Sequence, residues 1–135
     1  MRFKKQEVTA IFRMAFKMAA ADGKFMDEEK AAIAFGMREF GMSPSEMAEY
    51  TTSTADMDNV QALAILSSLD SNKKKYATGF LATIMACDGD IDDSEVKMWQ
   101  LICTLANFPT MSVGEAIVFW KNCVDKGFII IEPEG

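Results

Sequence analysis

The densest group of chemically active side chains in this 135-residue sequence is a run of carboxylates near residue 90. The segment 87–95 reads Cys-Asp-Gly-Asp-Ile-Asp-Asp-Ser-Glu and contains no Lys or Arg. Its acidic residues are Asp88, Asp90, Asp92, Asp93 and Glu95. Carboxylate oxygens are the ligands that hard cations such as Ca²⁺ and Mg²⁺ prefer. These five side chains are therefore candidate metal ligands.

A related acidic segment lies 66 residues earlier, with residue 22 standing against residue 88. Residues 21–29 read Ala-Asp-Gly-Lys-Phe-Met-Asp-Glu-Glu. Three of its acidic positions coincide with acidic positions of the later segment: Asp22, Asp27 and Glu29. They form a poorer ligand set, because Lys24 and Met26 stand where the later segment has aspartates.

The later segment also matches the second half of an EF-hand loop, in which Asp-Gly is followed by five residues and Glu. The first and third ligand positions of such a loop fall on Ile84 and Ala86, whose side chains cannot bind a cation. We therefore exclude an EF-hand. Two interpretations stay open: the carboxylates form a weak divalent-cation site, or Asp92 and Glu95 cap a helix while the other aspartates are solvated.

Each acidic segment is expected to form the corner between two helices. An Asp-Gly pair can end a helix through the left-handed conformation, so Gly23 and Gly89 should have positive φ. The spacing Asp92-x-x-Glu95 is typical of a capping box that opens the next helix. Ile91 is the one apolar side chain of its segment, and we expect it to point into the core.

The correspondence between the two segments continues along the chain. Gly41 and Asn107 both suit a left-handed helix terminus and should end the two second helices. A Ser-x-x-Glu capping box follows each of them, at 43–46 and 112–115. The predicted unit is a helix, an acidic corner, a second helix, a short connection and a third helix, used twice. The two copies span about 5–50 and about 72–123.

The periodicity of apolar residues predicts an all-α fold. We expect a compact bundle of about seven helices, built from two repeated helix–acidic corner–helix units that share one core in a single domain, 1–135. The expected helices cover 4–21, 27–40, 43–50, 58–69, 71 to the second corner, 93–106 and 113–124. Segment 51–58 is expected to be a polar break. The apolar tail 127–131 should pack on the helices or pair with another chain.

The repeated Ala-x-Asp-Gly-x-apolar-x-x-x-Glu corner resembles the TerB-like domains, the tellurite-resistance and DjlA-type helical family. Residues 20–29, 40–44 and 86–95 carry the likeness, which covers roughly 5–123. The resemblance implies an all-helical domain with internal repeat symmetry. From the repeat, the many methionines and the lack of catalytic groups, we expect a non-enzymatic interaction or scaffold domain of this TerB-like type, in a bacterial-type stress response.

The composition argues against several classes of function. The sequence has no His, which excludes His-based relays and His-ligated zinc, and it has no Gly-rich phosphate loop, so we expect no enzyme. Ca²⁺ and Mg²⁺ are the candidate cofactors. The net charge of −6 argues against nucleic-acid binding, and no segment reaches the ~20 apolar residues of a membrane span. Three Cys without metal-ligand spacing are expected to be buried thiols of a cytoplasmic protein.

The partner is expected to be a protein, and the sequence leaves open whether it is a second copy in a homodimer. Eleven Met in 135 residues are expected to fill the core, with an adaptable binding groove as the alternative. The Lys run 73–75 is either solvated or a basic patch that faces a partner.

Overall fold

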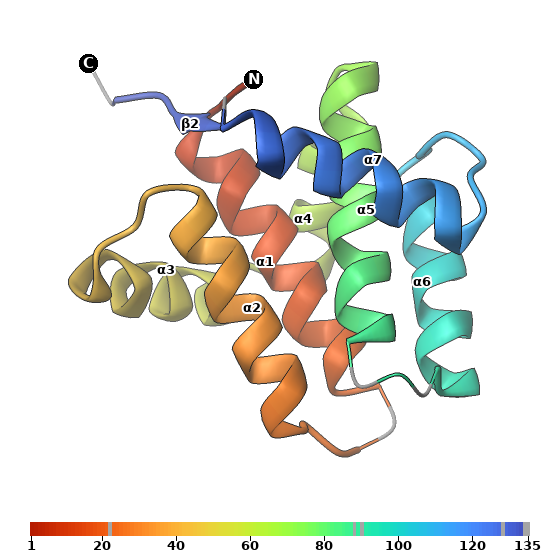
Figure 1. The fold of residues 1–135 in the computed structure, drawn as a ribbon. Helices are drawn as coiled ribbons and strands as arrows, with labels where there is room; N and C mark the ends of the chain where they lie inside the picture. Colours follow the sequence, from red (N-terminus) through yellow and green to blue (C-terminus); the bar gives the residue numbers. More distant parts are fainter. Residues whose placement is uncertain (22, 88, 90, 128, 134–135) are drawn as a thin grey trace.

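The structure of the chain, a computed structural model, describes residues 1–21, 23–87, 89, 91–127 and 129–133. In these residues it contains seven helices and two short strands (Figure 1). The helices are α1 (Lys5–Ala19), α2 (Asp27–Glu39), α3 (Pro44–Asp56), α4 (Asn59–Ser67), α5 (Ser71–Ala86), α6 (Asp93–Leu105) and α7 (Val113–Lys126). The prediction of an all-α bundle of about seven helices is confirmed. No helix in the described ranges is both long and apolar enough to cross a membrane.

The core is built around α1 and α5, which lie side by side in the centre of the bundle (Figure 1). Each has buried residues around most of its circumference, as expected for a helix covered on several sides. Phe12 of α1 and Phe80 of α5 meet edge to face, with ring centroids 5.3 Å apart. Tyr76 of α5 packs in the same way on Phe40, at 5.7 Å. The two helices therefore share one aromatic core.

The other helices cover this pair. α2 and α3 lie on one side of the bundle, α6 packs beside α5, and α7 crosses α5 (Figure 1). Gly79 allows the close crossing of α5 and α7, because a Cβ there would overlap the carbonyl oxygen of Ala116 and lie 2.7 Å from the Cβ of Trp120. Trp99 of α6 is buried, and its indole N–H donates to the carbonyl of Thr78 at 3.2 Å.

The predicted starts and stops hold at most helix ends. Five helices have a side-chain N-cap that accepts backbone N–H groups, namely Ser43, Asp58, Asp70, Asp92 and Ser112. Gly41 and Asn107 follow α2 and α6 with φ of 82° and 55°, and Gly23 and Gly89 both have φ of 79°. The four left-handed positions expected from the sequence are thus confirmed.

The third helix is longer than predicted. Residues 51–56, expected to be a polar break, continue α3 as far as Asp56. Thr51 and Thr52 donate their hydroxyls to the helix carbonyls of Met47 and Ala48, at 2.8 and 3.2 Å. Thr54 is buried against the bundle. The hydroxyls are satisfied inside the helix, so a polar sequence did not require a loop.

The apolar tail packs on its own chain. Strand β2 (Ile130–Ile131) pairs in parallel with β1 (Arg2–Phe3). The N–H of Ile130 donates to the carbonyl of Met1 at 3.0 Å, and the N–H of Glu132 donates to that of Phe3 at 2.8 Å. Of the two arrangements left open for this tail, the structure has the one within the chain.

Candidate functional site

The second acidic corner is organised as a helix start. Asp92 is the N-cap of α6, and its Oδ1 accepts the N–H groups of Ser94 at 2.7 Å and Glu95 at 3.4 Å. Asp92 and Asp93 are exposed, whereas Glu95 is buried. The expected capping role of Asp92 is confirmed. The candidate ligands Asp88 and Asp90 lie outside the described residues.

The first acidic corner opens α2 with a different residue pair. Oε1 of Glu29 accepts the N–H of Met26 at 3.0 Å. The residue is only 3% exposed, and its Oε2 is buried without a hydrogen-bond partner among the described residues. Asp27 is exposed and pairs with Lys30 at 3.9 Å. Asp22 lies outside the described residues.

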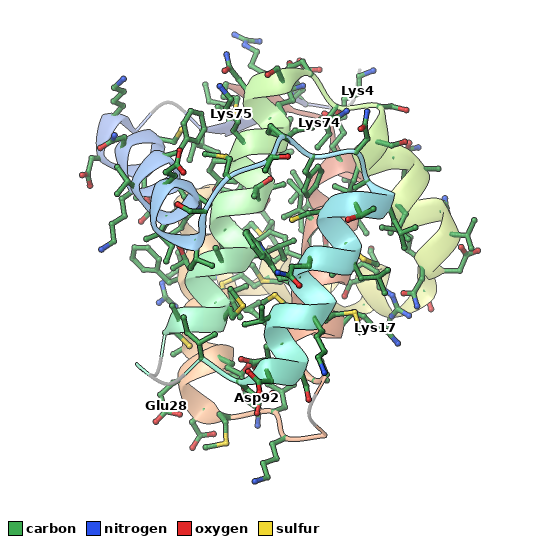
Figure 2. All side chains as sticks on the ribbon, turned by 90° about the vertical axis from the view of Figure 1, so that its right-hand side faces the viewer. Lys4, Lys17, Glu28, Lys74, Lys75 and Asp92 are labelled. Carbon is green, nitrogen blue, oxygen red and sulfur yellow. The ribbon has the colours of Figure 1, made fainter. Side chains whose placement is uncertain are left out.

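The two corners lie at the same end of the bundle. Figure 1 shows the C-terminal ends of α1 and α5 and the starts of α2 and α6 at the lower end of the bundle. Figure 2 shows Glu28 and Asp92 at this end and Lys4, Lys74 and Lys75 at the opposite end. Within the described ranges, no three His, Cys, Asp or Glu residues gather closely enough to hold a metal ion.

One apolar side chain of the corners is not where the sequence placed it. Ile91 was expected in the core but is 46% exposed. Its counterpart Phe25 packs edge to face on Phe16, at 5.8 Å between ring centroids. The residue at the place of Phe16 in the second half is Ala82, which offers no ring to pack on. Ile91 therefore has less to cover it.

An apolar groove of about 380 Å³ runs between α2 and α3, beside the first corner. Its floor is Ile33 and Met37 of α2, both buried. The half-buried rings of Phe16 and Phe25 line it as well. The remaining lining residues are Lys30, Ala34, Met47, Ala48 and Thr51. Both walls are helices, and each contributes one Met.

Lys30 is the one cationic residue among those that line this groove. The ammonium of Lys30 lies 5.4 Å from the ring centroid of Phe25 and 3.9 Å from Oδ1 of Asp27. The side chains of Lys30 and Asp27 are 58% and 99% exposed. An ion pair this open to water contributes little, so Lys30 remains available to an external carboxylate.

A second groove, of about 500 Å³, uses the corresponding positions of α6. Trp99, Gln100 and Cys103 line it, and they stand 66 residues after Ile33, Ala34 and Met37. Its other walls include the polar side chains of Thr104 and Asn107. The same helix positions thus open a groove in both halves of the chain, with a more apolar lining in the first half.

The sequence did not predict that a groove lies between α2 and α3. The available signals were Met37 and Met47, which fit the alternative use of methionine in an adaptable groove, and the neighbouring aromatic residue Phe25. A groove needs two walls at a definite separation, and the sequence does not give the distance between α2 and α3.

The cysteines are less buried than the sequence suggested. Cys87 is exposed, and Cys103 and Cys123 are half-buried. Burial raises the pKa of the Cys103 thiol to about 12, and burial also raises the pKa of Cys123. Because the thiolate is the reactive form, these two thiols are poor nucleophiles at neutral pH.

Comparison with known proteins finds a similar solved structure but no described family. No model of a known protein family matches the chain, and neither does any curated protein. The crystal structure of a protein of unknown function from Porphyromonas gingivalis matches it with a TM-score of 0.81 and 41% sequence identity. The alignment covers 90% of this chain and 98% of that one. The chain therefore belongs to the same family as this Porphyromonas gingivalis protein of unknown function.

Proposed function

We propose that the chain is a non-enzymatic protein-interaction or scaffold domain of the TerB-like type. The observation that supports this most is the open apolar groove between α2 and α3. Apolar side chains gathered at a surface hollow are typical of protein-binding sites. The proposed role in a bacterial-type stress response and the proposed cytoplasmic location rest on the resemblance and composition of the sequence.

Other large apolar side chains also reach the surface. They include Phe35, Val60, Leu101, Leu105 and Val118, each at least 41% exposed. Single exposed apolar residues are ordinary, but Leu101 and Leu105 are neighbours on one face of α6. They offer a further contact area in a scaffold.

The proposal is tested by capturing partners with the intact chain. The tagged protein is cross-linked in lysate of its source cells, and the cross-linked peptides are mapped by mass spectrometry. We expect one or a few proteins to be enriched over an unrelated acidic helical domain, with cross-links on defined lysines. Failure to enrich any partner, including a second copy of the chain, would contradict the proposal.

A second candidate function is weak divalent-cation binding at the acidic corner 88–95. The run of five carboxylates within 88–95 supports it, and Asp92 and Asp93 of this run are open to solvent. The candidate ligands are Asp88, Asp90, Asp92, Asp93 and Glu95. Ca²⁺ and Mg²⁺ suit an oxygen-only set.

A further inference from the structure

The size of the α2–α3 groove suggests what enters it. A cavity of about 150 Å³ is enough for a benzene-sized group. The groove, at about 380 Å³, therefore has room for two or three apolar side chains. Met37 and Met47 line it from opposite walls and can adjust to different shapes.

The backbone around the groove argues for a helical occupant. Both walls are α-helices, whose N–H and C=O groups are bonded internally along most of their length. The hydroxyl of Thr51 already donates to the carbonyl of Met47 at 2.8 Å. An extended peptide would find few main-chain partners there, whereas a helix satisfies its own backbone groups.

The rim of the groove suits the approach of another helix. Ala34 on α2 and Ala48 on α3 line it, and Ala48 is exposed. Small side chains on both walls let a third helix come close, since interaxial distance depends on the side chains at the contact. The charge at the mouth comes from Lys30, whose partner Asp27 is 99% exposed. Because this ion pair is open to water, Lys30 can exchange Asp27 for an acidic residue next to the apolar anchors.

We propose that the groove between α2 and α3 binds an amphipathic helix of a partner protein, with apolar anchors spaced i, i+4 and i+7 and an acidic residue placed to meet Lys30. This inference rests on the proposed interaction function and names the partner's chemistry. The anchors fill the space above Ile33 and Met37, and the acidic residue exchanges with Asp27 at the ammonium of Lys30.

The test uses designed helical peptides of about 16 residues, long enough to populate a helix. Three peptides carry Leu, Met or Phe at the anchor positions with Glu beside them, and three matched peptides carry Lys in place of Glu. Binding to the intact chain is followed by fluorescence anisotropy. We expect at least one Glu peptide to bind, and its Lys counterpart to bind about tenfold more weakly.

Variants on the groove locate the binding. Ala48→Gln places a longer side chain at the mouth, and its control Ala55→Gln lies two turns further along α3, outside the groove. Lys30→Glu reverses the charge, and its control Lys97→Glu lies on α6. We expect Ala48→Gln and Lys30→Glu each to lower the affinity for the Glu peptide about tenfold or more. Both controls should bind this peptide as tightly as the original chain does.

Three outcomes would overturn the inference. The first is that no peptide binds, or that the groove variants bind as well as their controls. The second is saturable binding of dodecanoate that Ala48→Gln abolishes, which would make the groove an acyl-chain site. The third is a concentration-dependent dimer that Ala48→Gln disrupts, which would assign the groove to a second copy. If captured partners bind Ala48→Gln unchanged, the groove is wrong while the interaction function stands.

Discussion

The carboxylate of Glu29 is held inside the protein by one backbone group. Its Oε1 accepts the N–H of Met26, which helps to satisfy the exposed donors at the start of α2. Its Oε2 is buried without a partner in the described residues, an arrangement that costs about 1–3 kcal/mol. Glu29 therefore combines a stabilising contact with a destabilising one, and both lie at a single helix start.

The left-handed glycines of the corners give a direct prediction. Gly23 has φ of 79°, and no atom lies within 4 Å of an added Cβ, so Gly23→Ala tests backbone strain alone. We expect it to lower the free energy of unfolding by about 1–2 kcal/mol in urea denaturation. The control Gly114→Ala lies in α7, where a Cβ also meets nothing, and should stabilise by up to about 1 kcal/mol. Equal effects of the two substitutions would contradict this account.

Trp99 stabilises the core by burying its ring and by donating its indole N–H to the carbonyl of Thr78. Trp99→Ala should cost about 3–5 kcal/mol, the usual range for a buried aromatic residue. Trp99→Phe keeps a ring but loses the bond to the carbonyl of Thr78, and should cost less. Chemical denaturation monitored by circular dichroism measures both. A loss below about 1 kcal/mol for Trp99→Ala would mean that the residue does not support the core as its burial implies.

At the residue scale, the sequence predicted what depends on local chemistry. The left-handed positions and the capping role of Asp92 follow from the residue type and its immediate neighbours. The exposure of Ile91 could not be predicted in this way, because it depends on whether a ring or a methyl group stands at residue 82 across the corner. Pattern alone treated Phe25 and Ile91 as equivalent.

Among the elements, the crossing of α5 and α7 has the least room for change. A Cβ on Gly79 would overlap the backbone of Ala116, which cannot rotate away as a side chain can. Gly79→Ala should therefore cost about 3 kcal/mol or more, as overpacking does where nothing yields. Gly36→Ala would meet the ring of Phe80 instead and should cost less. Thermal unfolding ranks the two variants, and a smaller loss for Gly79→Ala would show that α7 shifts easily.

The contacts that the Lys run 73–75 makes with other elements could not be predicted from the sequence. Lys73 pairs with Glu7 at 3.3 Å and lies 5.4 Å from the ring centroid of Phe3. Lys75 lies 5.8 Å from the ring centroid of Phe119. The run was expected to be solvated or to face a partner, yet two of its members hold α5 to other parts of the bundle. Residues 7 and 73 meet only after the chain has folded.

At the scale of the whole molecule, the two acidic corners lie at the same end of the bundle. Figure 2 shows Glu28 and Asp92 at this end, Lys17 nearer to them, and Lys4, Lys74 and Lys75 at the opposite end. The sequence predicted two corners of similar chemistry and one shared core, but it did not predict that both corners would lie at the same end. Carboxylates of both corners therefore share one end of a molecule whose net charge is −6.

This concentration of charge gives the last prediction, which separates a cation site from helix caps. A cation bound at the second corner would stabilise the fold by about 1.4 kcal/mol at tenfold excess over its dissociation constant. That corresponds to a rise in Tm of about 5 °C for a domain of this size. If the corner only caps α6, Ca²⁺ should act like NaCl of matched ionic strength.

The variant that tests this is Asp88→Asn/Asp90→Asn, which precedes the cap and leaves Asp92 in place to accept the N–H groups of Ser94 and Glu95. Its control, Asp56→Asn/Asp125→Asn, removes the same charge from exposed positions of α3 and α7. A cation site predicts that millimolar Ca²⁺ raises the Tm of the original chain and of the control but not of the corner variant. Identical shifts in all three proteins would leave the carboxylates as caps and solvated charges, because screening alone does not distinguish which aspartates were removed.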